Sequence, residues 1–178
     1  VPARIEVTEF FSYACIHCFN FEPFVQAWRQ KKARDVDLVL IPATFRPDFA
    51  ILARGYYASE ALGVSAKVHA GVFDALWKHQ RTAATVSELA DLYASLGIDR
   101  GKFIDAAASF GVEAKLKQVD QTMLRYNVGG TPDIIVAGKY RVLLGHLAKS
   151  ADAFQVVDYL VGLERAERKR AAQMPVKR

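Results

Sequence analysis

Cys15 and Cys18 stand three positions apart and are the only two cysteines in the 178-residue chain. Residues i and i+3 of a helix have Cα atoms about 5 Å apart, which a disulfide accepts. A disulfide here would close a loop of about four residues, and the chain-entropy model gives such a loop only about 2 kcal/mol. The pair is poorly placed as a structural staple, so we predict that it is redox-active.

The position of the pair at the start of a predicted helix favours different roles for the two sulfurs. Cys15 would lie at or just before the first turn, where unpaired backbone N–H groups and the helix dipole favour an anion. The pKa of its thiol should therefore fall and its reactivity rise. Cys18 would lie one turn deeper, where burial keeps it protonated. We expect Cys15 to form the mixed disulfide and Cys18 to resolve it.

His17 lies between the two cysteines. A partly protonated imidazole beside a thiolate stabilises the reduced form, which makes the disulfide a stronger oxidant. The alternative is an exposed helical histidine that has no effect on the couple.

A CxxC pair is also half of a zinc site, which needs four ligands. The chain has no second pair, His69 and His79 are ten residues apart, and His146 is alone. Phe19 follows Cys18, so the haem-attachment pattern is absent too. We expect no metal and no cofactor other than the disulfide of the pair itself.

Two further positions favour redox chemistry. Glu9 lies in the strand that leads into the motif, where a buried carboxyl could shuttle the proton for Cys18 because desolvation raises its pKa; a solvent-facing side chain is the alternative. Thr131-Pro132 follows two glycines and is a candidate cis peptide. The Thr131 backbone could then face the disulfide and pair with an extended substrate, although a plain turn fits the pattern as well.

The elements that position these residues begin with a βαβ unit. Residues 4–11 alternate apolar and polar and predict a strand, and residues 36–41 predict a second strand that ends at Pro42. Between them, Cys15 to about Ala33 predicts a helix, in which Pro23 should cause a kink. Two strands joined through a helix in about 40 residues indicate a parallel pair.

A helical block of roughly 75 residues follows. Ser65, Thr85 and Asp99 are its predicted N-caps. The expected helices cover about 48–63, 65–79, 86–96, 100–109 and 111–126.

Strand character returns after the Thr131-Pro132 segment. Residues 134–137 and 140–143 flank Gly138-Lys139 and predict a hairpin, and Ser150 is the predicted cap of a helix over 151–170. The expected class is α/β, with the order βαβ, helical block, ββα. The expected parts are 1–47 and 127–178 for one domain and 48–126 for an inserted helical subdomain.

The bulk composition is that of an ordinary globular domain, with 52% apolar and 24% charged residues. No run of 18 apolar residues predicts a membrane span, and no signal-peptide pattern precedes the first strand. Residues 164–178 hold six basic and two acidic residues, which is four of the chain's net five positive charges. Such a tail could touch nucleic acid or anionic lipid. We favour a solvated helix end that suits the helix dipole, and expect no nucleic-acid partner.

Residues 9–22, EFFSYACIHCFNFE, strongly resemble the active-site segment of the DsbA family of bacterial periplasmic thiol:disulfide oxidases. Gly130-Thr131-Pro132 and the later Gly138-Lys139-Tyr140 resemble the family's cis-proline loop and following hairpin. The resemblance spans nearly the whole chain. It implies a thioredoxin-like fold with a helical insertion, a place in the periplasm and reduced, newly exported polypeptides as clients. It also implies reoxidation by a quinone-linked membrane oxidase of the DsbB type.

The resemblance also assigns roles by position. By position, Cys15 matches the family's nucleophile, Cys18 its buried partner and His17 the tuning histidine. Glu9 matches the buried acid, Pro132 the cis-proline and Glu22 a second acidic residue near the site. The residues expected to contact clients are Thr131, Pro132, Tyr13 and Ile16. Two departures stand out. Ile16 replaces the family's usual proline, which could change the potential, and Thr131 stands where some members carry valine. Because only eight residues precede Glu9, we also expect the family's N-terminal edge strand to be missing or trimmed.

Other functions stay open at this stage. Threonine before the proline also occurs in thioredoxin-fold reductases and isomerases, but isomerases usually need a dimerisation module, for which the chain has no room, and we expect a monomer. A glutathione-binding branch of the fold generally lacks an intact CxxC. A chaperone-like binding module that uses the apolar surface around Phe11, Tyr13 and Ile16 is the alternative from a different class.

Overall fold

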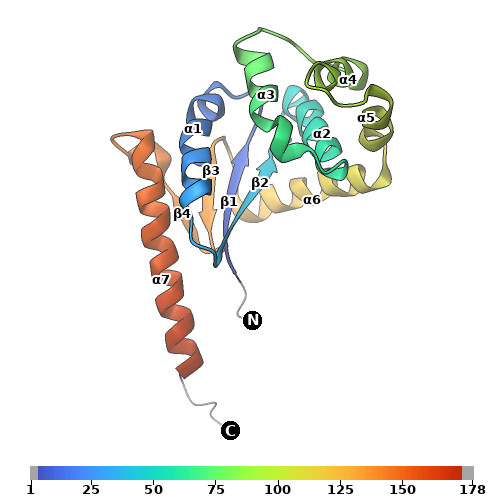
Figure 1. The fold of residues 1–178 in the computed structure, drawn as a ribbon. Coiled ribbons are helices and arrows are strands. Elements are labelled where there is room, and N and C mark those ends of the chain that lie inside the picture. Colours follow the sequence, from blue (N-terminus) through green and yellow to red (C-terminus); the bar gives the residue numbers. More distant parts are fainter. Residues whose placement is uncertain (1–3, 174–178) are drawn as a thin grey trace. The chain divides into compact units, whose positions relative to one another are not determined.

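A computed structural model describes residues 4–173 of the chain. Its elements follow the expected order of a strand–helix–strand unit, five helices, and a hairpin followed by a helix (Figure 1). They are β1 Ile5–Phe11, α1 Ile16–Lys31, β2 Val36–Pro42, α2 Pro47–Ala61, α3 Ser65–Trp77, α4 Val86–Ser95, α5 Arg100–Ala107, α6 Phe110–Tyr126, β3 Asp133–Val136, β4 Tyr140–Val142 and α7 Ala153–Gln173, with short 3-10 helices at Leu144–His146 and Ser150–Asp152.

The four strands form one sheet in the order β2-β1-β3-β4. β3 and β4 are antiparallel, with Ile134 opposite Val142 and Val136 opposite Tyr140. β1 and β2 are neighbours joined through α1, as the βαβ pattern predicts. The expected fold class, a thioredoxin-like core interrupted by a helical insertion, is confirmed.

Packing contacts divide the described residues into two compact units. Residues 4–9, 23–40 and 133–173 form unit 1, and residues 10–22 and 41–132 form unit 2. Both cysteines and the Thr131-Pro132 segment therefore belong to unit 2. The domain boundaries at 47/48 and 126/127 stay a sequence-based prediction.

Unit 1 is built around the sheet and α7, which runs alongside the hairpin strands (Figure 1). The second half of α1 packs on α7 through Trp28, whose indole stacks on Phe154 with ring centroids 5.0 Å apart. The indole Nε1 also donates a hydrogen bond to Asp158 Oδ1 at 2.8 Å. Val157 and Val161 are buried on the same face of α7, so one amphipathic stripe holds this helix in place.

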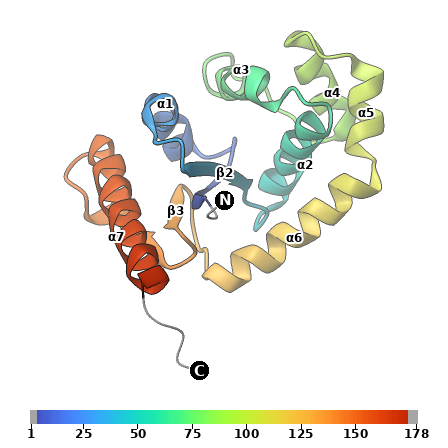
Figure 2. The same cartoon turned by 60° about the horizontal axis from the view of Figure 1, so that its bottom comes forward.

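Unit 2 gathers α2 to α6, and α2 contacts the other four of these helices (Figure 2). Buried side chains on nearly all sides of α2 explain its central place. Tyr93 of α4 stacks on Phe103 of α5 with centroids 4.3 Å apart. Gly55 of α2 lies so close to Leu89 and Tyr93 that an added Cβ would meet their atoms at 3.2 Å.

Of the four predicted helix N-caps, two are confirmed and two are wrong. Thr85 accepts a hydrogen bond from Glu88 N at 3.2 Å, and Asp99 accepts one from Lys102 N at 2.8 Å, so both predicted caps are confirmed. The Ser65 cap is wrong, because Val64 occupies the N-cap and Ser65 is the first helical residue. Ser150 is likewise not the cap of α7, since it begins a separate 3-10 turn before that helix.

The hairpin turn is one residue longer than its sequence predicted. Val136 pairs with Tyr140, so Ala137, Gly138 and Lys139 form the loop. Ala137 has φ 54° and Gly138 has φ 68°. Glycine adopts positive φ readily, whereas alanine rarely does. Local preference therefore places Ala137 in the strand and leaves Gly138 and Lys139 as a two-residue turn.

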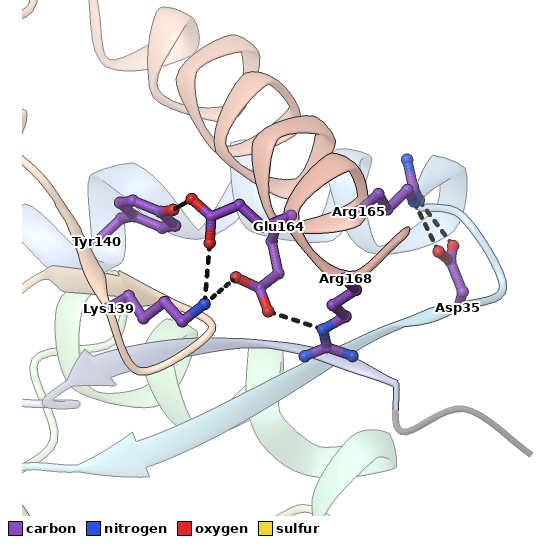
Figure 3. A network of polar contacts seen from close by, with 7 residues as sticks. Asp35, Lys139, Tyr140, Glu164, Arg165 and Arg168 are labelled. Atoms are coloured by element: carbon purple, nitrogen blue, oxygen red, sulfur yellow. Dashed lines mark hydrogen bonds and ion pairs between the residues drawn. The ribbon is translucent and has the colours of Figure 1, made fainter. Parts of the chain in front are cut away.

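The basic C-terminal segment is helical as far as the structure describes it, and two of its arginines, Arg165 and Arg168, are paired (Figure 3). Arg165 donates two hydrogen bonds to Asp35, at 2.6 and 2.7 Å. Glu164 is 3% exposed and accepts from Lys139 and from Arg168, each at 2.7 Å. Lys177 and Arg178 lie outside the described residues. Among residues 4–173, no helix is both long and apolar enough to cross a membrane.

Candidate active site

The segment from Ser12 to Cys15 forms a tight turn between β1 and α1. Cys15 N donates to Ser12 O at 3.1 Å, and Ala14 N donates to Ser12 Oγ at 3.1 Å. Phe19 N donates to Cys15 O at 3.0 Å, so Cys15 is the residue just before the first turn of α1. This is the position that the sequence predicted for it.

Cys15 is partly exposed, and its Sγ donates a hydrogen bond to Thr131 O at 3.3 Å. The pKa of its thiol is lowered from 9.0 to about 5. The largest cause is a hydrogen bond from the Cys18 thiol, which outweighs the opposing effect of burial. The Thr131 side chain and the backbone N–H groups of Cys18 and His17 lower it further. Hydrogen bonds to the anion favour the thiolate, as expected at a helix N-terminus.

Cys18 has the opposite character. Its side chain lies in the interior and the residue is 1% exposed. Burial raises the pKa of its thiol well above 9.0, and the hydrogen bond to Cys15 raises it further. Both cysteines are free thiols in the structure. A proton-holding Cys18 beside a partly exposed Cys15 is the asymmetry that the sequence predicted.

His17 is exposed and contributes to the site through its backbone N–H, which lowers the pKa of Cys15. The tuning effect of its imidazole stays a prediction. Glu9 is 3% exposed in β1, which excludes the solvent-facing alternative. Glu22 is 8% exposed on α1. Ile16 begins α1 and is 39% exposed, so it is available to a partner.

Thr131 and Pro132 are both partly exposed, and the peptide bond between them is cis, as predicted. Tyr13 differs from expectation. It was expected to contact clients, but it is only 1% exposed and its ring is part of the interior. Aromatic neighbours, among them Phe11 and Phe73, enclose it with centroids 5.2 and 4.8 Å away.

Two residues near the site were missed at the sequence level, His69 and Trp77 of α3. The hydroxyl of Tyr13 is hydrogen-bonded to His69 Nδ1 at 2.7 Å, and Trp77 Nε1 donates to Tyr13 O at 2.9 Å. Their separation of 56 and 64 residues from Tyr13 leaves no local signal for these contacts. The only hint is an apolar helix that carries a single histidine on its buried side. Within the described residues, no group of three or more potential ligands could hold a metal ion.

Comparisons with known proteins cover most of the chain. A family model described as a DSBA-like thioredoxin domain matches residues 6–157. The thiol:disulfide interchange protein DsbA of Azotobacter vinelandii is 38% identical over 165 residues, which cover 93% of this chain and 77% of that protein.

Solved structures give the same result. The crystal structure of Pseudomonas aeruginosa DsbA has a TM-score of 0.89 and 35% identity, and covers 95% of this chain and 88% of that one. The oxidoreductase DsbA from Xylella fastidiosa has a TM-score of 0.85 and 34% identity, over 93% of this chain and 88% of its own.

Proposed function

Because the chain belongs to the DsbA family of thiol:disulfide interchange proteins, we propose that Cys15 and Cys18 perform the exchange in fixed and separate roles. The observation that carries the proposal is the contrast between the two thiols. The pKa of Cys15 is lowered to about 5 at a partly exposed position, and the pKa of Cys18 is raised at a buried one. A low nucleophile pKa is already known for DsbA proteins, so its direction here is expected for a member.

The oxidising cycle begins from the Cys15–Cys18 disulfide. A client thiolate attacks Cys15 Sγ, the exposed sulfur, and the bond between the two cysteines breaks. Cys18 leaves with the electron pair and takes a proton, and the client is held by a mixed disulfide at Cys15. A second client thiolate then attacks the client's own sulfur. This step forms the client disulfide and releases Cys15 as a thiolate, so the client loses two electrons and the cysteine pair gains them.

Stabilisation of the departing Cys15 thiolate drives the second step. A thiol whose pKa is about 5 is almost fully ionised at neutral pH and is a good leaving group. The imidazole of His17, which is exposed beside the pair, adds to this tendency when protonated. The couple therefore favours the reduced enzyme, and this preference makes it an oxidase.

The proton for Cys18 comes from Glu9, the buried carboxyl of β1. Glu22 is a second acidic residue on α1, four positions after Cys18, and tunes the couple by its charge. Both roles rest on the burial of these side chains and on their match to acidic positions of the family.

The client lies across Ile16, Thr131 and Pro132. The carbonyl oxygen of Thr131 is 3.3 Å from Cys15 Sγ, so the backbone of an extended chain bound at Thr131 would present its cysteine to Cys15. Ile16 offers an exposed apolar side chain beside the nucleophile. Tyr13 is buried and is not part of this surface.

Each turnover leaves a dithiol, so the protein needs an oxidant that accepts two electrons and two protons. A quinone-linked membrane oxidase of the DsbB type supplies this reaction, and the clients are reduced polypeptides newly exported to the periplasm. The chain acts there as a monomer. The membership of the DsbA family supports these assignments.

Two cysteine variants test the roles with reduced, unfolded ribonuclease as the client. Because Cys18→Ser cannot form the internal disulfide, its Cys15 is first converted to the mixed disulfide with glutathione. A client thiolate should then attack Cys15 Sγ, release glutathione as the thiolate and form a disulfide-linked complex that Cys18 can no longer release. Cys15→Ser should form no complex and no ribonuclease disulfides. Exchange activity that survives in Cys15→Ser would contradict the proposal and would favour a role for Cys18 as the nucleophile.

A further inference from the structure

Helix α3 holds Tyr13, two positions before the nucleophile, at two points. Trp77 Nε1 donates to the backbone oxygen of Tyr13 at 2.9 Å. His69, two turns earlier on the same helix, is hydrogen-bonded through Nδ1 to the Tyr13 hydroxyl at 2.7 Å. The backbone and the side-chain tip of Tyr13 are therefore both fixed by residues of the inserted helices.

The other nitrogen of His69 faces α1. Its Nε2 lies 3.4 Å from Glu22 Oε2. Glu22 is four positions after Cys18 and seven after Cys15, so it lies on the same face of α1 as the cysteine pair. The imidazole thus bridges the segment that precedes the CxxC motif and the helical turn that follows it.

Solvent is excluded from this bridge. The side chains of His69 and Glu22 are only 4% and 10% exposed, and Tyr13 is 1% exposed. The rings of Phe11 and Phe73 lie against the imidazole, with centroids 5.2 and 5.3 Å from it. Tyr56 of α2 adds a third ring at 6.1 Å. Electrostatic effects are stronger in such surroundings than in water.

The protons of the bridge fit its two partners. Burial raises the pKa of Tyr13 well above 10.0, so its hydroxyl keeps its proton. A neutral imidazole that accepts this proton at Nδ1 carries its own hydrogen at Nε2, the atom that faces Glu22. A protonated imidazole would place a full positive charge beside the Glu22 carboxylate. In both forms His69 opposes the negative charge of Glu22.

We propose that His69 is a positioning residue of the exchange reaction, acting through Tyr13 and Glu22 on the first turn of α1. It fixes the backbone N–H groups that stabilise the Cys15 thiolate, and it offsets the charge of Glu22 on the face that carries both cysteines. The proposal deepens the function proposed above and rests on it.

Loss of the imidazole should make the couple less oxidising for two reasons that act in the same direction. A loosened turn presents its N–H groups less well to the thiolate. The Glu22 carboxylate, about 10 Å along the helix from Cys15, then repels the thiolate more strongly. A charge at that distance in a medium of effective dielectric about 20 shifts a pKa by about one unit.

The first experiment compares the parent with His69→Phe, which keeps a ring in the aromatic cage but removes both nitrogen contacts. The exposed His79, just beyond the end of α3, gives the matched control His79→Phe. We expect His69→Phe to raise the thiolate midpoint of Cys15 by about one pH unit and to shift the glutathione equilibrium about tenfold towards the oxidised protein. The control should match the parent in both. A His69→Phe midpoint equal to the parent's, with only a lower melting temperature, would overturn the proposal.

Two further variants keep the proposal testable if His69→Phe folds poorly. Tyr13→Phe removes a single buried oxygen and should shift the midpoint upward by a smaller amount, whereas an unchanged midpoint contradicts the bridge. In His69→Phe/Glu22→Gln the repelling charge is gone, so the midpoint should return part of the way. No return would contradict the role of Glu22.

These results are distinguishable from a failure of the proposed function. If the parent itself showed no exchange and a midpoint near 9, the oxidase function would fail. If the parent exchanged disulfides with a low midpoint and His69→Phe behaved identically, only the role of His69 would fail.

Discussion

Two regions of the molecule depend on charge. The CxxC corner of unit 2 consists of Cys15, Cys18 and the bridge formed by Tyr13, His69 and Glu22, and the α7 cluster of unit 1 consists of Lys139, Glu164 and Arg168. On α7, Lys139 and Arg168 reach Glu164 from side chains that are 50% and 38% exposed. Their hydrogen bonds lower the pKa of Glu164, and the bond from Lys139 has the largest effect. Glu164 therefore stays ionised at neutral pH. At the corner, Cys18 and the imidazole bridge are buried, and aromatic rings pack against His69 and Tyr13.

The comparison shows where charge changes chemistry and where it only secures structure. In the α7 cluster, the cationic side chains that pair with Glu164 are partly exposed, and water screens their charges. The cluster therefore ties the helix to the hairpin without altering a titration near neutral pH. The corner moves the pKa of Cys15 to about 5, below neutral pH. Variants of the corner should therefore change redox behaviour, and variants of the cluster should change stability alone.

The largest effect is expected for Cys18→Ala. The Cys18 thiol provides the strongest of the hydrogen bonds that lower the pKa of Cys15. Its loss should raise the thiolate midpoint of Cys15 by roughly one to two pH units. Ultraviolet absorbance of the thiolate, followed against pH, measures this shift. Cys18→Ser keeps a donor and should move the midpoint less; equal midpoints in the parent and Cys18→Ala would break the comparison.

The second prediction concerns the stability of the reduced protein against pH. The pKa of Cys15 is about 5 when folded and near 9.0 when unfolded. Its contribution is therefore present in full above pH 9, declines as pH falls, and is lost near pH 5. We expect the melting temperature of the reduced parent, relative to Cys15→Ser, to rise by a few degrees from pH 5 to pH 9.

The direction in which this difference in melting temperature changes with pH is the test. Cys18 has a raised pKa, so its opposing contribution begins only above about pH 9, where the unfolded thiol ionises. A difference between the two proteins that does not change with pH would contradict the lowered pKa of Cys15.

Glu164→Gln addresses the other region. The variant leaves two cationic partners and removes the buried carboxylate between them. We expect a loss of about 1 kcal/mol in the free energy of unfolding, measured by urea titration. The thiolate midpoint of Cys15 should equal that of the parent. A shifted midpoint would mean that the α7 cluster also governs the redox couple.

The smallest effect is expected for Ile16→Pro. Ile16 is the first residue of α1, where proline fits without the loss of an intrahelical hydrogen bond. The variant should gain about 0.5–1 kcal/mol in the free energy of unfolding, because proline restricts the unfolded chain. Ile16→Ala separates this effect from loss of the apolar side chain. A destabilised Ile16→Pro would show that the turn before α1 is not preorganised for proline.

Much of this molecule was predictable from local sequence patterns. Strand alternation over residues 4–11, the caps Thr85 and Asp99, and the position of Cys15 at a helix start all depend on neighbours within a few residues. The fold class follows from the order of these elements. Where only local geometry decides, the sequence was a good guide.

The errors have different physical causes. Ser65 is displaced from the cap by Val64, and Ala137 adopts a positive φ that alanine disfavours. In both places the wider structure overrides local preference. The bridge through His69 was invisible because a histidine 56 residues from Tyr13 carries no local mark of its partner. Tyr13 was assigned to the surface, although its ring completes a core built from three elements.

The most direct test of the proposed role of Cys15 is the absorbance of its thiolate against pH in the reduced parent protein, with Cys15→Ser as the blank. We predict a single midpoint near 5, because hydrogen bonds from the Cys18 thiol and from groups at the start of α1 stabilise the anion. A midpoint near 9.0, the value of an unperturbed thiol, would contradict this prediction.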